Sequence, residues 1–335
     1  MTLAASDVGA QSKITANGIL KGDGSGNITA ANETEVKLVS LPNICNPNLL
    51  DNWYFGNPVN QRGQTSYTGT YIYTIDRWKT GNTVTIVDGG IKIKRTTHTY
   101  LFYQPLSDEL LNAIAGKVVT YSVLTTEGLF SVTSSCPTDV NATWDTDNAV
   151  QGNLVVDIYG LDIERKILRF YSLVDGTEAT IIAAKLELGS QQTLAHRENG
   201  VWVLNEIPDY GEQLLKCQRY YRSLFKPNVD YAVPATATAE GVLHLDYALN
   251  PTMRTSPVLV GDTHGALRIV AYNMNDLSVA IAEPCDYIDL VTNGTSVDRS
   301  TLKIVPNSGV SLVGRYCFTV DTFGISTQFG LSADL

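Results

Sequence analysis

Three aspartates and one tryptophan form the densest group of residues in the sequence that could carry out chemistry. Asp139, Asp145 and Asp147 surround Trp144 in the stretch CPTDVNATWDTDNAV. An indole ring can stack on a pyranose while carboxylates accept hydrogen bonds from its hydroxyls, so one interpretation is a saccharide site. Oxygen-rich loops also suit calcium, so a structural calcium ion is the one cofactor that the sequence suggests. A solvated loop without a ligand is the simplest account of the three acids.

A second candidate surface lies in the stretch TYIYTIDRW. Tyr71 and Tyr73 are two residues apart, so on a strand both side chains project from one face. They would form an exposed tyrosine surface for a glycan, or they pack as ordinary strand tyrosines. Trp53, Trp78 and Trp202 are further candidate sugar platforms. Trp78 ends an Asp-Arg-Trp pattern at a predicted strand end, which favours a role in the core.

The sequence contains no distinctive catalytic set. Glycoside hydrolysis needs two carboxylates roughly 5 to 10 Å apart, and no acidic pair here stands out. No Gly-x-Ser-x-Gly elbow occurs, and the four histidines lie in different regions without metal-binding spacing. The loop GDGSGN fails the Walker, dinucleotide and EF-hand patterns. We therefore expect no enzymatic activity and no bound cofactor, and keep a polysaccharide depolymerase as the enzymatic alternative.

Composition and charge restrict the class of protein further. The 335 residues are 44% hydrophobic but only 17% charged, with 17 tyrosines, which is typical of strands and turns. The net charge of −10 disfavours binding to nucleic acid or to anionic membranes. The five cysteines are far apart and form no C-x-x-C pair, which argues against a zinc site. The sequence shows no secretory signal and no apolar run long enough for membrane insertion.

The central part of the sequence predicts one strand after another. In VTIVDGGIKIKR, Val84, Ile86, Ile91 and Ile93 fall on one face of a hairpin. About eight short strands in roughly 150 residues predict an antiparallel β-sandwich of jelly-roll type. The predicted strands are 70–75, 83–87, 90–96, 117–125, 128–132, 153–159, 166–173 and 180–188.

Two stretches have helical character. In LSDELLNAIAGK, Ser107 would cap a short helix that Gly116 closes. In DYGEQLLKCQRYY, apolar and aromatic residues separated by polar ones predict about three helical turns that link two β regions; they are Leu214, Leu215, Tyr220 and Tyr221. The sequence after this helix predicts a second all-β domain, with strands at 241–245, 258–260, 267–272, 277–282, 287–291, 303–305 and 314–320.

Several ordered motifs resemble the β-sandwich module of phage and prophage tail-fibre and receptor-binding proteins. AAKLELGSQQTL looks like the closing strand of that module, and YGEQLLKCQRYY looks like the helix that follows it. The N-terminal LAASDVGAQ and NGILKGDGSGNITAA are similar to fibre connectors. The resemblance covers roughly residues 3–222, and its opening pattern falls on Asn48, Leu49, Leu50, Asn52, Phe55, Gln61, Arg62, Gly63, Asp76, Arg77 and Trp78.

The resemblance implies a virion protein, made in the host bacterial cytoplasm, that attaches to a saccharide of the host surface. It implies a homotrimer, with Tyr220 and Tyr221 in the seam between chains and the C-terminal domain presented outward. The expected layout is an attachment segment for other tail or baseplate proteins (1–44), a carbohydrate-binding-like sandwich (45–205), a linking helix (206–226) and a C-terminal β domain (227–335). A purely structural tail or baseplate component is the main alternative.

Overall fold

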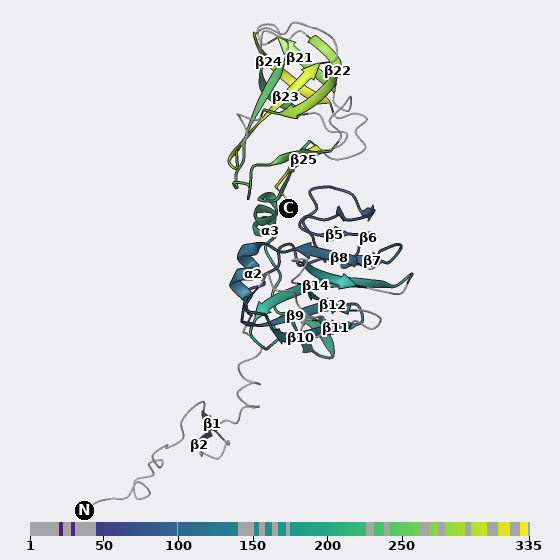
Figure 1. Cartoon of the computed structure of the whole chain (residues 1–335), viewed down its shortest axis with the longest axis vertical. Coiled ribbons are helices and arrows are strands. Elements are labelled where there is room, and N and C mark those ends of the chain that lie inside the picture. Colours follow the sequence, from purple (N-terminus) through teal and green to yellow (C-terminus); the bar gives the residue numbers. More distant parts are fainter. Residues whose placement is uncertain are drawn as a thin grey trace, which may run out of the picture.

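The computed structural model describes much of the chain after residue 44 and two short pieces before it. The described residues are 20–22, 28–30, 45–98, 100–139, 151–153, 158–162, 167–171, 175–225, 231–237, 242–261, 268–273, 279–291, 296–306, 314–321 and 329–333. Within them the protein consists of antiparallel sheets and two short helices, which confirms the predicted all-β class. Figure 1 shows a barrel at one end, then a small sheet beside helix α3, then two larger sheets with helix α2.

Two six-stranded antiparallel sheets form the larger body. The strand order is β10-β9-β14-β7-β6-β3 in the first sheet and β11-β12-β13-β8-β5-β4 in the second. The first sheet contains β3 (Ser66–Thr68), β6 (Thr83–Val87), β7 (Gly90–Lys94), β9 (Val118–Thr125), β10 (Gly128–Ser135) and β14 (Glu178–Leu188). The second contains β4 (Ile72–Tyr73), β5 (Lys79–Thr80), β8 (Tyr100–Pro105), β11 (Gln151–Asn153), β12 (Ile158–Asp162) and β13 (Ile167–Tyr171).

The two sheets pack face to face around an aromatic core. Trp78 stacks on Phe102 with ring centroids 4.6 Å apart, and Phe102 stacks on Phe170 at 6.2 Å. Tyr121 of the first sheet meets Phe170 of the second edge-on at 6.4 Å. All four rings are almost completely buried. Burial of this apolar area is the main driving force that holds the sheets together.

The predicted hairpin is confirmed. Val84 of β6 lies opposite Ile93 of β7, and Ile86 lies opposite Ile91. Both isoleucines of β7 and Val84 are fully buried, whereas Ile86 is half-buried. The alternation of apolar residues therefore placed this hairpin in the core correctly.

Two of the strands predicted for the larger body differ markedly from the structure. The strand expected at 70–75 is only the two residues of β4 in the structure. Tyr71 adopts a φ of 58°, which interrupts the extended chain. The strand expected at 153–159 is wrong, since Asn153 of β11 pairs with Ile158 of β12 in an antiparallel hairpin. The chain thus reverses direction within the predicted strand.

Both predicted helices are present. Helix α2 (Asp108–Ile114) begins at Ser107, whose hydroxyl accepts a hydrogen bond from the Leu110 N–H at 3.2 Å. Gly116 follows its end with a φ of 67°. Helix α3 (Tyr210–Gln218) is capped by Asp209 and has nine residues, slightly fewer than three turns. It ends before Tyr221 because that residue begins a strand.

A three-stranded sheet lies next to α3. Its order is β17-β25-β20, with β17 (Tyr221–Phe225), β20 (Val258–Val260) and β25 (Phe329–Ser332). It has a small core of its own that includes Leu249, Met253 and Leu331. The chain enters the barrel after β17, passes back through β20 between barrel strands β19 and β21, and returns to β25, so the barrel is connected to all three strands of this sheet.

The barrel closes through six strands in the order β18-β19-β23-β22-β21-β24. The strands predicted at 277–282 and 287–291 are one long strand, β22, with a register shift between Cys285 and Tyr287. The barrel strands are β18 (Tyr231–Ala237), β19 (Leu243–Ala248), β21 (Arg268–Asn273), β22 (Val279–Leu290), β23 (Arg299–Pro306) and β24 (Gly314–Asp321).

Two hairpins complete the described elements. Near the N-terminus, β1 (Leu20–Gly22) pairs with β2 (Ile28–Ala30) within the stretch that resembles a fibre connector. After the larger body, β15 (Ala195–Glu198) pairs with β16 (Val201–Leu204), which carries Trp202. The Arg197 guanidinium lies 5.1 Å from the centroid of that ring.

The burial of Trp78 predicts a large loss of stability on truncation. We expect Trp78→Ala to lower the free energy of unfolding by about 3 to 5 kcal/mol, because it removes a fully buried indole. The matched control is Trp202→Ala, which removes a half-buried indole and should cost about 1 kcal/mol. Urea unfolding measures both, and Trp78→Phe replaces the first variant if it does not fold. Equal losses from the two alanine variants would contradict this account of the core.

Candidate functional site

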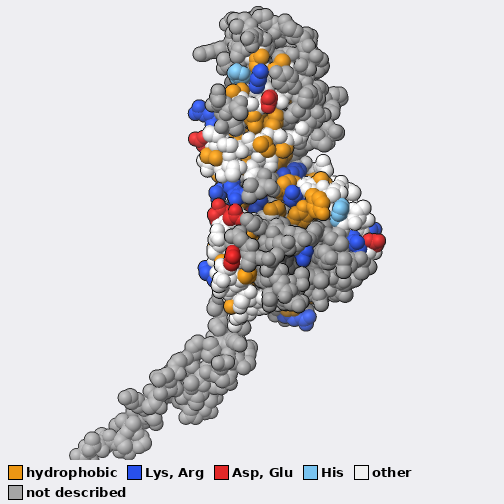
Figure 2. All heavy atoms as spheres, viewed as in Figure 1, with side chains coloured by type: hydrophobic (Ala, Val, Ile, Leu, Met, Phe, Trp, Pro, Cys, Tyr) orange, Lys and Arg blue, Asp and Glu red, His pale blue; other side chains and the backbone are white. Residues whose placement is uncertain are grey.

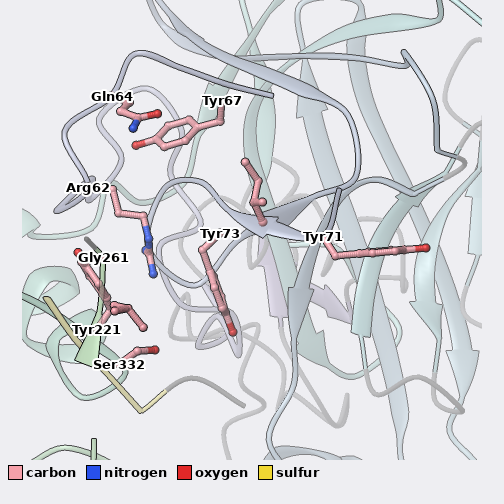
Figure 3. Close-up of a pocket in the computed structure, with 10 residues that line it drawn as sticks. Arg62, Gln64, Tyr67, Tyr71, Tyr73, Tyr221, Gly261 and Ser332 are labelled. Carbon is pink, nitrogen blue, oxygen red and sulfur yellow. The ribbon is translucent and has the colours of Figure 1, made fainter. Parts of the chain in front are cut away.

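A pocket lies where the larger body meets the three-stranded sheet. Its volume is about 510 Å³. The body contributes residues around β3 and β4, and the small sheet contributes residues of β17, β20 and β25 (Figure 3). Figure 2 shows hydrophobic, Lys and Arg side chains gathered at this level of the molecule. The lining residues are Arg62, Gln64, Tyr67, Tyr71, Ile72, Tyr73, Tyr221, Val260, Gly261 and Ser332.

Four tyrosines supply much of the pocket wall. Tyr71 is 49% exposed, and its ring lies 5.2 Å from the His98 ring. Tyr73 is half-buried on β4, whereas Tyr67 and Tyr221 are buried. Tyr71 and Tyr73 do not alternate on one strand face as predicted, since Tyr71 precedes the strand in the left-handed region. Both nevertheless line the same pocket, so the sequence identified the right pair by the wrong geometry.

Arg62 lies between two of these rings. Its guanidinium carbon is 3.9 Å from the centroid of Tyr221 and 4.9 Å from that of Tyr73. Lys79 approaches the Tyr73 ring as well, with its Nζ 4.7 Å from the centroid. Stacking of a guanidinium on aromatic faces restricts its rotation. The arginine is therefore held as a fixed positive group at the pocket.

The pocket also offers hydrogen-bonding groups of neutral side chains. Gln64 and Ser332 contribute an amide and a hydroxyl. The Tyr67 hydroxyl donates to Oδ1 of Asn60 at 2.5 Å. Burial raises the pKa of Tyr67 to about 12, so this hydroxyl stays neutral at physiological pH. None of the described lining residues is acidic, and the pocket combines aromatic faces with donors and one cation.

Asp76 is buried next to the pocket and stabilises residues that line it. Its carboxylate, 1% exposed, accepts hydrogen bonds from the Gln61 backbone N–H at 2.7 Å and from Gln61 Nε2 at 3.1 Å. It also pairs with Arg62 at 3.5 Å. The same Gln61 amide donates to the Tyr221 carbonyl at 2.7 Å. Asp76 thus positions both the arginine and, through Gln61, the strand that carries Tyr221.

Asn52 connects the same segment to helix α3. Its side chain donates to the carbonyls of Val59 and Asp76 at 2.9 and 2.8 Å and accepts from the Val59 N–H at 2.7 Å. Its backbone N–H donates to Gln213 Oε1 of α3 at 2.9 Å. Asn52 is 2% exposed and has a φ of 51°, so side-chain hydrogen bonds compensate a strained backbone.

Arg77 and Trp78 complete this junction. Arg77 Nε donates to Asp51 at 3.2 Å, and its guanidinium carbon lies 3.5 Å from the Tyr220 ring centroid. The Trp78 indole N–H donates to the carbonyls of Asp51 and Asn52. The prediction that Trp78 packs in the core is confirmed. Much of the motif that suggested the family therefore joins the body to α3 and β17.

Asp139, the one residue of the predicted aspartate site that the structure describes, does not line this pocket. Asp139 is exposed and lies four residues beyond β10, at the opposite edge of the first sheet from β3. Trp144, Asp145 and Asp147 lie outside the described residues. The structure therefore brings together Tyr71 and Tyr73 among the predicted ligand-binding residues and places Asp139 elsewhere.

Two other expectations need correction. Trp53 and Trp78 are 3% and 0% exposed, so neither offers a face to a sugar. Tyr221 is 2% exposed within one chain, covered by Arg62, and Tyr220 packs on Arg77. Tyr221 is thus an internal contact and not part of a seam between chains.

Sequence reasoning also missed residues that line the pocket. Arg62 appeared only as part of a family pattern, and Gln64, Tyr67 and Tyr221 received no ligand-binding role. The dense tyrosines around Gln-Arg-Gly were the available signal. Their convergence with a strand more than 140 residues later requires the tertiary structure.

The described residues hold no group of three or more His, Cys, Asp or Glu placed to bind a metal ion. The calcium prediction for the aspartate loop stays open, since two of its acids lie outside these residues. Within the same part of the chain, no helix is long and apolar enough to cross a membrane.

The junction predicts a marked cost for neutralising Asp76. Asp76→Asn places an amide donor against donors of Gln61 and Arg62, so we expect a loss of about 2 kcal/mol or more in unfolding free energy. The control is Glu178→Gln, which removes an ion pair with Lys92 whose side chains are both 42% exposed. Because solvent screens that exposed pair, its loss should shift the unfolding midpoint much less than Asp76→Asn does. Chemical denaturation compares the two variants, and an unchanged Asp76→Asn midpoint would refute the junction as described.

No protein-family model, curated protein or solved structure matches the chain. The resemblance to tail-fibre proteins therefore rests on the sequence motifs alone.

Proposed function

We propose that the chain is a phage or prophage tail-fibre protein that attaches the virion to a saccharide on the host bacterial surface. The observation that carries this proposal is the pocket, in which tyrosine faces surround Arg62 and Gln64. Saccharides are recognised by aromatic stacking on their apolar faces and by hydrogen bonds to their hydroxyls. The family resemblance of the sequence supplies the biological context.

The chemistry of the lining residues favours binding over hydrolysis. A glycosidase requires a carboxylic acid and a second carboxylate around the scissile bond. The described lining residues contain neither, so a depolymerase would need acids from another part of the chain. The net charge of −10 and the pairing of Arg62 with Asp76 favour neutral sugars, to whose hydroxyls the guanidinium can donate hydrogen bonds.

We propose a homotrimer with a jelly-roll-like sandwich and the four-part layout given above. The N-terminal segment would join other tail or baseplate proteins, and the protein would act in the virion after synthesis in the host cytoplasm. Apolar residues on and before α3 support self-association, since Leu215 and Ile207 are 53% and 70% exposed. Three linked sites would raise the apparent affinity by a factor of about a hundred or more.

The pocket predicts weaker host attachment when its exposed rings are removed. We expect Tyr71→Ala and Tyr73→Ala each to weaken binding to whole host cells and to purified surface polysaccharide by roughly tenfold. Val201→Ala, which shortens an apolar side chain of 65% exposure on β16 that does not line the pocket, serves as the control and should bind normally. Fluorescent-protein binding to cells and glycan arrays give the affinities.

Two results would redirect the proposal. Full binding by both pocket variants, with loss in Trp144→Ala, would move the site to the aspartate loop. No binding by the unaltered protein to any host surface would favour the purely structural tail component.

The trimer predicts a native mass near three times the 36.4 kDa of one chain. Light scattering measures this mass directly. Leu215→Glu should reduce it by placing charge on the exposed face of α3, whereas Val258→Glu on β20 should not, although Val258 is exposed to 60%. A monomeric unaltered protein, or equal effects of the two variants, would contradict a seam at α3.

A further inference from the structure

A lysine buried in the larger body contacts a cysteine. Lys185 lies on β14 with a fully buried side chain. Its Nζ is 2.9 Å from the Cys45 sulfur and 3.1 Å from Oε1 of Glu206. Cys45 lies at the start of the larger body, Lys185 lies on a strand within a sheet, and Glu206 lies in the segment before α3.

The nitrogen–sulfur distance is the notable feature of this cluster. A distance of 2.9 Å is ordinary for N–H···O hydrogen bonds, and sulfur is a larger atom than oxygen. The other polar contacts of the Cys45 sulfur, to the carbonyls of Asn46 and Thr193, are 3.8 and 3.7 Å long. The lysine nitrogen is therefore held against the sulfur more closely than a weak hydrogen bond requires.

The cluster also has access to small reagents. Cys45 is half-buried and Glu206 is 35% exposed, whereas Cys136 is 4% exposed. Burial raises the pKa of Cys136 to about 11, which leaves it as an unreactive thiol. Burial also raises the pKa of Cys45, partly offset by Lys185, so we expect its oxidation to be faster in alkaline solution. Lys185 and Glu206 are the charged groups that face the Cys45 thiol.

We propose that a peroxide oxidant joins Cys45 and Lys185 by a covalent bridge between sulfur and the lysine nitrogen. Hydrogen peroxide first oxidises the thiol to a sulfenic acid and is itself reduced to water. The lysine amine then attacks the sulfur, the sulfenic hydroxyl leaves as water, and a sulfur–nitrogen bond forms. A second peroxide acting on the sulfenic acid and amine would instead retain the oxygen as a sulfur–oxygen–nitrogen bridge, with two waters released.

Glu206 makes the nitrogen reactive in this scheme. The lysine must lose a proton before its lone pair can attack, and the Glu206 carboxylate at 3.1 Å is placed to accept that proton. No charge is left uncompensated in the interior, because the ammonium and the carboxylate become neutral together. Glu206 is thus a positioning and proton-accepting residue for the crosslink.

The bridge would tie the point where the N-terminal segment leaves the body to the centre of the first sheet. It would span residues 45 to 185, a long loop of the kind for which a crosslink restricts the unfolded chain most. Formation would be suppressed in a reducing cytoplasm and favoured outside the cell. This inference does not depend on the proposed ligand.

Peptide mass spectrometry of the full chain tests the proposal. After treatment with hydrogen peroxide and digestion with trypsin, we expect a peptide pair joined at Cys45 and Lys185, with the cleavage after Lys185 missing. Its mass should equal the sum of the two peptides less two hydrogens, or that mass plus one oxygen. Dithiothreitol should release the pair, and the treated protein should melt at a higher temperature than before treatment.

Three variants make the result specific. Cys45→Ser should abolish the crosslink and the rise in melting temperature, Cys136→Ser should change neither, and Glu206→Gln should slow formation several-fold. Cys45 oxidised to sulfinic or sulfonic acid with Lys185 unmodified would overturn the proposal, as would an unmodified pair after peroxide has oxidised methionine in the same sample.

Discussion

The need to satisfy the buried polar groups of residues 48–78 governs much of this structure. This segment has little regular secondary structure, so its backbone groups need side-chain partners. Asn52 and Asp76 supply them within the segment, and Gln213 and the Tyr221 carbonyl extend the network into α3 and β17. An unmet donor at any of these positions would cost more than one formed bond contributes. The larger body and the small sheet are therefore joined by hydrogen bonds as well as by packing.

The pocket is a consequence of that junction. Arg62 is fixed by Asp76 and by two tyrosine rings, one from each side of the boundary. The Tyr221 ring also packs closely against Gly330 of β25. A Cβ at position 330 would lie only 2.7 Å from the Tyr221 hydroxyl, so this packing requires glycine. The pocket is therefore rigid although its lining residues come from different sheets. Ligand binding at such a boundary gains from preorganisation, since the groups that contact the ligand are already ordered.

The same need to provide partners for buried polar groups explains how strand β14 can carry buried charges. Lys185 and Glu187 are both fully buried although they flank a leucine on a strand in the middle of a sheet. Glu187 accepts a hydrogen bond from the Thr193 N–H at 2.7 Å, and Lys185 pairs with Glu206. The segments that cover β14 thus supply the residues that pair with its buried charges, Thr193 for Glu187 and Glu206 for Lys185. That arrangement places Cys45 against the lysine.

The sequence by itself determined the all-β class, the β6–β7 hairpin, both helices, the Ser107 cap of α2, and the core position of Trp78. These features depend on local periodicity and on short-range hydrogen bonds, which a linear pattern contains. It also singled out Tyr71 and Tyr73. Only the tertiary structure decided that β11 and β12 form a hairpin, that Tyr221 is internal, and that Arg62, Tyr73 and Tyr221 meet. Those outcomes depend on contacts between segments far apart in the chain, and the free energy of such contacts is set by packing and desolvation that no local pattern records.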